Sequence, residues 1–158
     1  MMNQQQIGRA GEHLTASYLC RYFDEIFECP PHARYDFLAV SNNKSYKIQV
    51  KTSNSTFLKN NNDWVRWDIK KKVSNKTISR IYDKEEVDIF AFCFLSLDKV
   101  IFIPNEKLGK TYQKKLEFVK GFDALPSLET AVEIINILRE KENEPESKRF
   151  IQAVSAGS

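Results

Sequence analysis

A strand with one apolar and one polar face is predicted at residues 46–51. Side chains two positions apart on a strand point to the same face of the sheet. The apolar face carries Tyr46, Ile48 and Val50, and the polar face carries Lys47, Gln49 and Lys51. The polar face therefore presents an amide and an amine side by side, and the apolar face is free to pack on a core.

Residues 35–40 form a second short apolar run, and the turn-forming residues 41–44 separate the two runs. This pattern predicts an antiparallel hairpin, in which Asp36 lies beside Gln49 and Lys51. Residues 7–23 show the spacing of an amphipathic helix that can direct Glu12 toward the same sheet edge. Gly8 and Gly11 lie inside that helix, which indicates either a close approach of another group or a frayed first turn.

The order Gly-x-x-Gly-Glu, Tyr-Asp-Phe and Gln-Val-Lys-Thr-Ser resembles the PD-(D/E)xK nuclease superfamily. The resemblance spans residues 8–108 and is similar to the branch of group I intron homing endonucleases, some of which also have Gln before the Lys. The matching positions are Glu12, Asp36, Gln49 and Lys51. Two positions depart from the common pattern: Tyr35 stands where Pro is usual, and Gln49 stands where Asp or Glu is usual.

The resemblance implies an α/β fold of restriction-endonuclease-like type, with a mixed central sheet flanked by helices. It also implies a Mg²⁺-dependent endonuclease acting on double-stranded DNA at specific sites. Mg²⁺ prefers oxygen ligands, so we expect it to bind Asp36, Gln49, the Val50 carbonyl and Glu12. Lys51 is expected to orient the attacking water or to offset negative charge in the transition state.

The remaining elements follow from hydrophobic patterning. We expect an edge strand at 25–29, a long surface loop at 53–63, a strand at 64–69 and a strand buried on both faces at 87–95. A hairpin partner at 100–103 and an amphipathic helix at 127–142, capped by Ser127, complete a nuclease domain at residues 1–142. Residues 143–158 are charged and without pattern, which predicts a mobile tail.

Basic residues are concentrated around the predicted site. Residues 44–80 contain ten Lys and Arg against two Asp, whereas the whole chain has a formal charge of only +3. Such clustering is typical of a surface that binds a polyanion. The residues expected to contact DNA are Arg9, Lys59, Arg66, Lys70, Lys71, Lys72, Lys76 and Arg80. Of the two tryptophans in the basic stretch, we expect either Trp64 or Trp67, and not both, to be part of the core.

Two other functions remain open at this point: a DNA-binding module that has lost catalysis, and a nuclease that selects branched DNA or RNA. One such site cuts one strand, so we expect a homodimer or homotetramer, with the apolar stripe from Leu128 to Leu138 as either the interface or part of the core. Three cysteines without paired spacing and the lack of a long apolar run predict a cytoplasmic protein, in a prokaryotic or phage-encoded setting.

Overall fold

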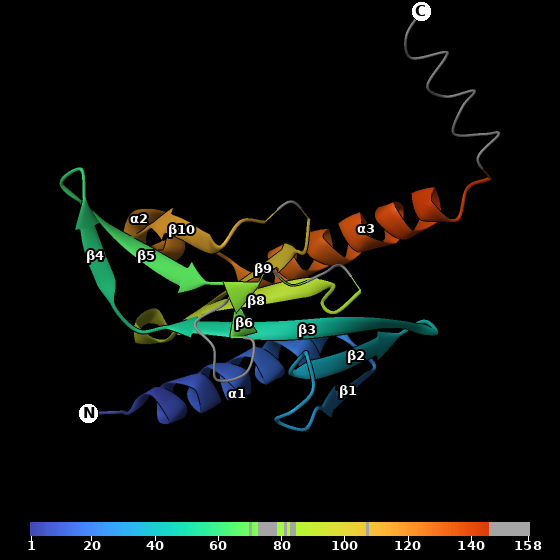
Figure 1. Ribbon diagram of the computed structural model, residues 1–158, viewed down its shortest axis with the longest axis horizontal. Helices are drawn as coiled ribbons and strands as arrows, with labels where there is room; N and C mark the ends of the chain where they lie inside the picture. The colour runs from blue at the N-terminus through green and yellow to red at the C-terminus, as the bar shows by residue number, and fades with distance from the viewer. Residues whose placement is uncertain (70, 73–78, 81, 83–84, 107, 146–158) are drawn as a thin grey trace, which may run out of the picture.

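A computed structural model describes residues 1–69, 71–72, 79–80, 82, 85–106 and 108–145. The main elements, in chain order, are α1 (Gln4–Tyr22), β1 (Glu25–Glu28), β2 (Phe37–Ser41), β3 (Lys44–Ser53), β4 (Thr56–Lys59), β5 (Asn62–Asp68), β8 (Ile89–Phe94), β9 (Lys99–Pro104), β10 (Thr111–Lys115), α2 (Leu116–Lys120) and α3 (Ala124–Glu142). They form three layers, with a mixed five-stranded sheet in the middle (Figure 1).

The central sheet has the strand order β1-β2-β3-β8-β9. β3 pairs with β8 in parallel, and the other neighbours pair antiparallel. The predicted hairpin is present as β2–β3, and its two-residue turn places Asn42 and Asn43 at positive φ of 53° and 59°. Asn tolerates this conformation better than most residues, so the turn holds the register that sets Phe37 opposite Ile48.

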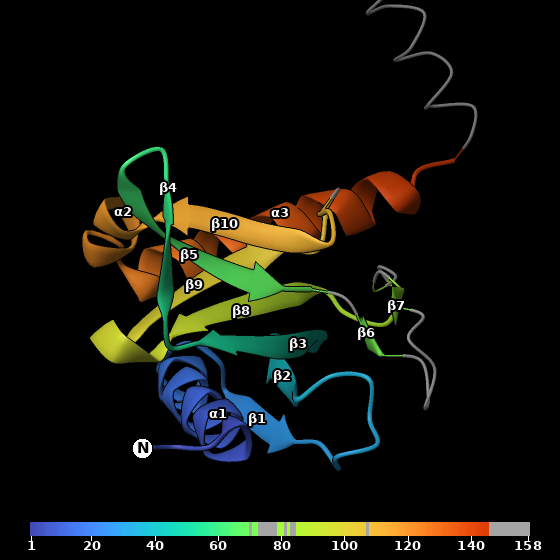
Figure 2. The same ribbon diagram turned by 60° about the vertical axis from the view of Figure 1, so that its left-hand side comes forward.

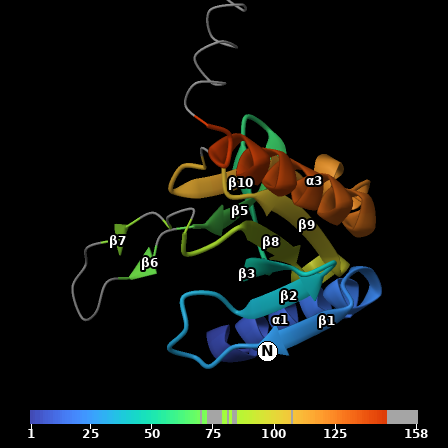
Figure 3. The same ribbon diagram turned by 90° about the vertical axis from the view of Figure 1, so that its right-hand side faces the viewer.

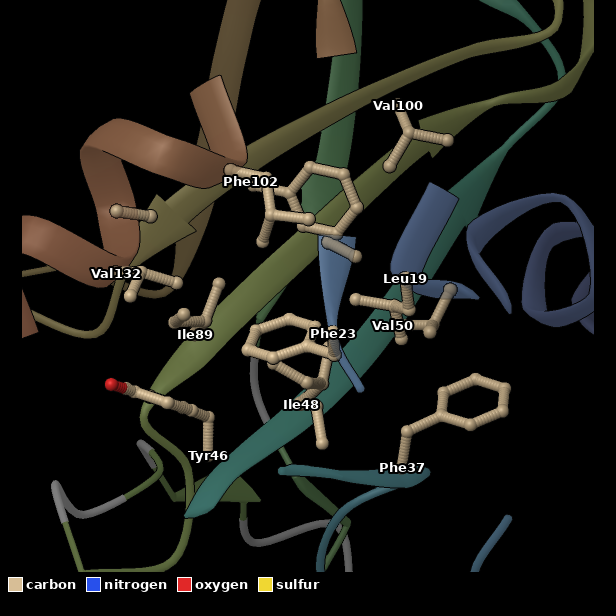
Figure 4. Packing of buried hydrophobic residues seen from close by; sticks show 14 of the residues in the cluster. Leu19, Phe23, Phe37, Tyr46, Ile48, Val50, Ile89, Val100, Phe102 and Val132 are labelled. Atoms are coloured by element: carbon tan, nitrogen blue, oxygen red, sulfur yellow. The ribbon is translucent and has the colours of Figure 1, made fainter. Parts of the chain in front are cut away.

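Both long helices cover the same face of the sheet, the one that carries the apolar side chains of β3. Leu19 of α1 and Phe23, the residue that caps its C-terminus, pack there with residues of α3 on a shared core (Figure 4). The stripe on α3 is part of this core, since Leu128, Ala131, Val132 and Ile135 are all buried. The interface alternative for this stripe is therefore wrong for these four residues.

A smaller sheet and α2 cover the opposite face of β8. The small sheet has the order β10-β5-β4, and its buried Val65 and Trp67 face a second core. The Trp67 indole N–H donates to the Cys93 carbonyl at 2.8 Å, and Tyr112 of β10 stacks on Phe92 at 4.5 Å. All six residues of β8 are buried because each of its faces meets a core. This confirms the strand predicted at 87–95.

Two expectations about local structure are wrong. Residues 53–63 are not a loop, because β3 extends to Ser53 and β4 pairs with β5 through a second Asn-Asn turn, with Asn60 and Asn61 at positive φ. Ser127 is not the helix cap, because α3 begins at Ala124 after Asp123. Its hydroxyl lies within the first turn, where it donates to the Ala124 carbonyl at 2.7 Å and accepts the Phe102 N–H at 3.1 Å. Pro126 fits there because N–H groups of a first turn have no partner within the helix.

The lysine-rich segment after β5 is described only in part. The backbones of β6 (Lys71–Lys72) and β7 (Ser79–Arg80) pair as a short hairpin at one end of the molecule (Figure 3). Residues 146–158, where most of the expected tail falls, lie outside the described residues. Among the helices that the structure describes, none is long and apolar enough to cross a membrane.

Candidate active site

The candidate site lies where β2 and β3 separate. β2 begins at Phe37, which pairs with Ile48, so in the described sheet the following residues of β3 pair with a strand on only one side, that of β8. The Val50 N–H on the open side donates instead to Asp36 Oδ2 at 2.7 Å. A carboxylate thus takes the place of the missing strand, because a half-buried N–H needs an acceptor.

Gln49 joins the same carboxylate. Its side-chain Nε2 donates to Asp36 Oδ2 at 2.8 Å and lies 3.3 Å from the Val50 carbonyl oxygen. The predicted neighbourhood of Asp36, Gln49 and the Val50 carbonyl is therefore present in the structure. Burial raises the pKa of Asp36, while the Val50 N–H and the charge of Lys51 act in the opposite direction and only partly offset it.

Lys51 lies on the same face and is held by a residue that was not among the predicted site residues. Its Nζ donates to the hydroxyl of Tyr82 at 3.1 Å and lies 4.9 Å from the centre of the Tyr82 ring. Tyr82 is buried and its ring packs edge-on against Phe90. Burial and the nearby carboxylates of Asp36 and Glu86 raise the pKa of Tyr82 to about 12, so the phenol stays neutral beside the lysine.

Glu12 approaches from α1, which crosses beneath β3 (Figure 1). Burial raises its pKa, and the negative charges of Asp36 and Glu28 raise it further. The approach depends on Gly11, where an added Cβ would lie 1.9 Å from Thr52 Oγ1. A Cβ at Gly8 would meet nothing within 4 Å, so only one of the two glycines marks a close contact.

The oxygen donors at this edge suit a hard divalent cation. Asp36 and the Val50 carbonyl both face the Gln49 amide N–H, so a partially positive group already lies between these two oxygens. Exchange of the amide nitrogen and oxygen by rotation would offer a third oxygen. Among the residues that the structure describes, no three His, Cys, Asp or Glu side chains gather as a metal site. The donor set therefore depends on one amide and one backbone carbonyl.

The structure describes the side chains of only some of the residues expected to bind DNA. Arg9, Lys59 and Arg66 are exposed, and Arg66 lines a cleft of ≈ 850 Å³ together with Lys51 and the start of α1. The side chains of Lys71, Lys72 and Arg80 are not described, and Lys70 and Lys76 lie outside the described residues. Trp67 is 1% exposed and Trp64 is half-buried on the other face of β5, as the alternation predicted.

The fold and this site define the class of restriction-endonuclease-like nucleases: a helix, a hairpin that carries an acid and a Gln-x-Lys strand, and a parallel strand beside it. A model of the PD-(D/E)XK endonuclease family matches residues 2–123, so the chain belongs to that family. The solved structure of a bacterial homing endonuclease, I-Ssp6803I, has the same fold, with a TM-score of 0.63 at 14% sequence identity. The match covers 90% of this chain and 100% of that one. No curated protein sequence matches the chain.

Proposed function

We propose that the chain is a Mg²⁺-dependent endonuclease that cuts double-stranded DNA at specific sites, with residues 1–142 as the nuclease domain. The observation that carries the proposal is the position of the Gln49 amide, whose nitrogen donates to both Asp36 Oδ2 and the Val50 carbonyl. A site that already accepts a partially positive group between two oxygens fits a small hard cation. The likeness to a homing endonuclease is the support for site specificity.

Asp36, the Val50 carbonyl, Gln49 and Glu12 are the residues that would hold the metal. Bound Mg²⁺ supplies a more acidic water and offsets charge on the scissile phosphodiester. Lys51 brings a positive charge to the phosphate and stabilises the charge that develops there, and Tyr82 keeps its ammonium group in place. Glu12, whose carboxyl has a raised pKa, can accept a proton from the attacking water at its carboxylate oxygen.

We also propose that the active form is a homodimer or a homotetramer. One site cuts one strand, so a two-fold pair of chains matches the two scissile phosphates of a duplex. The buried stripe on α3 is not available for this contact. Light scattering across a concentration series tests it, and a monomer that makes double-strand breaks in a single encounter would defeat it.

A second function has an observation of its own in favour. Gln49 carries no charge, and with its present hydrogen bonds it satisfies Asp36 without any metal. The chain could then be a DNA-binding module that keeps the fold without the reaction. Only an assay of cleavage separates these two functions, because both bind DNA.

The test is the nicking and linearisation of a supercoiled plasmid library with Mg²⁺ and with EDTA. We expect cleavage only with Mg²⁺, and none from Lys51→Ala, whose DNA binding should remain close to the parent because one charge is lost among several. If the parent binds duplex DNA but never cuts it at any Mg²⁺ concentration, the binding module is the correct function. If Lys51→Ala loses binding and cleavage equally, Lys51 is structural.

A further inference from the structure

The outer face of the β10-β5-β4 sheet is a second polar surface, separate from the edge that holds Asp36. Val65 and Trp67 are buried against the core, so their neighbours Trp64 and Arg66 point the opposite way. The strand register places Phe57 opposite Trp64 and Lys59 opposite Asn62, and Lys115 opposite Trp64 from the other side. The side chains on this face include Phe57, Lys59, Asn62, Trp64, Arg66 and Lys115. The face also carries Asp68, whose Oδ1 lies 3.7 Å from Arg66 Nε.

Aromatic rings hold the cations of this face in position. Lys59 Nζ lies 5.0 Å and Lys115 Nζ 5.8 Å from the centre of the Trp64 ring, and Arg66 Cζ lies 5.8 Å from that of Phe57. Cations placed over aromatic rings lose less side-chain freedom when they bind a ligand. Three preordered positive charges against the single carboxylate of Asp68 leave the face net positive, which suits a polyanion.

The surface is continuous with the candidate active site. The cleft that contains Lys51 is also lined by Phe57, Arg66 and Asp68 of this face. The tip of the β4–β5 hairpin points away from α1 in two views (Figures 1 and 2). A DNA duplex with a phosphate at Lys51 would therefore lie against the outer face of this hairpin.

The dimensions and residue types match a groove of duplex DNA. The major groove is about 12 Å wide and admits a two-stranded β-ribbon. Residues on one face of a strand repeat at about 6.8 Å, close to two base-pair steps of about 3.4 Å. Asn62 and Arg66 are exposed and four positions apart, so they would reach bases about four steps apart. Asn pairs well with adenine and Arg with guanine in this groove.

We infer that the β4–β5 hairpin reads base sequence in the major groove beside the scissile phosphate. Arg66 and Asn62 contact base edges, and Lys59 and Lys115 contact the flanking phosphates. The inference rests on the proposed function only in placing the scissile phosphate at Lys51. It assigns the sequence preference of the enzyme to an element outside the proposed metal site.

The test is selection of bound duplexes from a randomised pool, with full-length chains that carry Lys51→Ala so that binding is read without cleavage. In that background, we expect Arg66→Ala to lower discrimination about ten-fold at one or two adjacent base pairs. Asn62→Ala should do the same at a second position about four base pairs away. The matched control is Lys120→Ala on α2, which removes an exposed charge outside the cleft and should keep the parent profile.

Phosphate contacts give a different signature. Lys59→Ala should weaken binding to all sequences alike and lower the salt dependence of the logarithm of affinity by about one unit, with an unchanged profile. If Arg66→Ala and Asn62→Ala behave in that way too, the hairpin contacts only the backbone and the inference is wrong. The inference is also wrong if the chain prefers single strands, if it does not bind duplex DNA, or if the parent shows no base preference beside the cut.

The parent chain, assayed for plasmid cleavage in parallel, separates the two proposals. If the parent cuts DNA but Arg66→Ala leaves the base preference of the Lys51→Ala background unchanged, the inference is wrong and the proposed function stands. If the parent never cuts DNA but its base preference depends on Arg66 and Asn62, the proposed catalysis is wrong and the inference about the hairpin stands.

Discussion

Gly11 and Gly8 lie three positions apart on α1, and the structure predicts opposite results when each is replaced by Ala. A Cβ at Gly11 would lie 1.9, 2.8 and 2.9 Å from three atoms of Thr52, namely Oγ1, Cγ2 and Cβ. Rotation of Thr52 moves its Oγ1 and Cγ2, but its Cβ is fixed to β3. α1 therefore has to shift away from the sheet to accept the new methyl group.

The magnitude follows from two opposing effects. Overpacking a filled site costs about 1–3 kcal/mol. Ala in place of Gly within a helix gains about 1 kcal/mol. With three contacts under 3.0 Å, we expect Gly11→Ala to lower the free energy of unfolding by about 1–2 kcal/mol. Gly8→Ala, which meets nothing within 4 Å, should raise it by up to about 1 kcal/mol.

Urea denaturation followed by circular dichroism measures both changes, and each kcal/mol corresponds to about 2–4 °C in Tm for a chain of this size. A cycle with Thr52→Gly, which removes all three atoms, should show that at least about 1 kcal/mol of the Gly11→Ala cost depends on Thr52. If Gly8→Ala and Gly11→Ala stabilise the protein equally, no close approach exists. The conclusion that the contact between Gly11 and Thr52 brings Glu12 close to Asp36 would then be wrong.

Three further predictions concern the site. Gln49→Leu should abolish cleavage, whereas Gln49→Glu should keep activity or lower the Mg²⁺ requirement in a titration of plasmid cleavage; a Leu variant that cuts like the parent means Gln49 is not a ligand. Tyr82→Phe keeps the ring beside Lys51 but loses a charge-assisted hydrogen bond worth about 1.5–3 kcal/mol. The cleavage rate should therefore fall about 10–100-fold, with an unchanged Mg²⁺ requirement. An unchanged rate would show that the hydroxyl does not position Lys51. Burial raises the pKa of Asp36, so its contribution to stability is present below its unfolded-state pKa and is lost as pH rises through the folded-state pKa. Asp36→Asn keeps an acceptor for the Val50 N–H, so in urea denaturation it should raise the free energy of unfolding at pH 7 and show no such gain near pH 3; a loss of stability at pH 7 would contradict this.

Elements with a strong local pattern could be predicted from the sequence. The alternation of β3 separates Ile48 from Gln49, and the structure shows one buried and the other half-buried. The same reasoning predicted that only one of Trp64 and Trp67 is part of the core, and Trp67 is the buried one. The β4–β5 hairpin was missed although Asn60 and Asn61 repeat the Asn-Asn turn of the first hairpin. Hydrophobic periodicity predicted the strand at 64–69, but β4 has only four residues, too few for the same signal, so its pairing with β5 could be inferred only from the turn.

Elements stabilised by distant contacts could not be predicted in this way. β10 and α2 contain several lysines, and their few buried or partly buried side chains meet partners far along the chain, as Tyr112 does on Phe92. Tyr82 reaches Lys51 from 31 positions away, and nothing in its neighbours indicates that contact. The proposed metal ligands could be predicted because one hairpin and one helix bring them together. The residue that holds Lys51 depends on tertiary packing.

The end of the β2–β3 pairing explains why these groups gather at one edge. β3 has ten residues and β2 only five, so beyond Ile48 one side of β3 is left with N–H groups to satisfy. Asp36 meets that need at Val50, which draws a carboxylate into a half-buried position and raises its pKa. A β2 that began two residues earlier would give Val50 a backbone acceptor and leave Asp36 no reason to turn inward. The candidate site is thus a consequence of where a strand begins, and variants that lengthen β2 should lose the site without losing the fold.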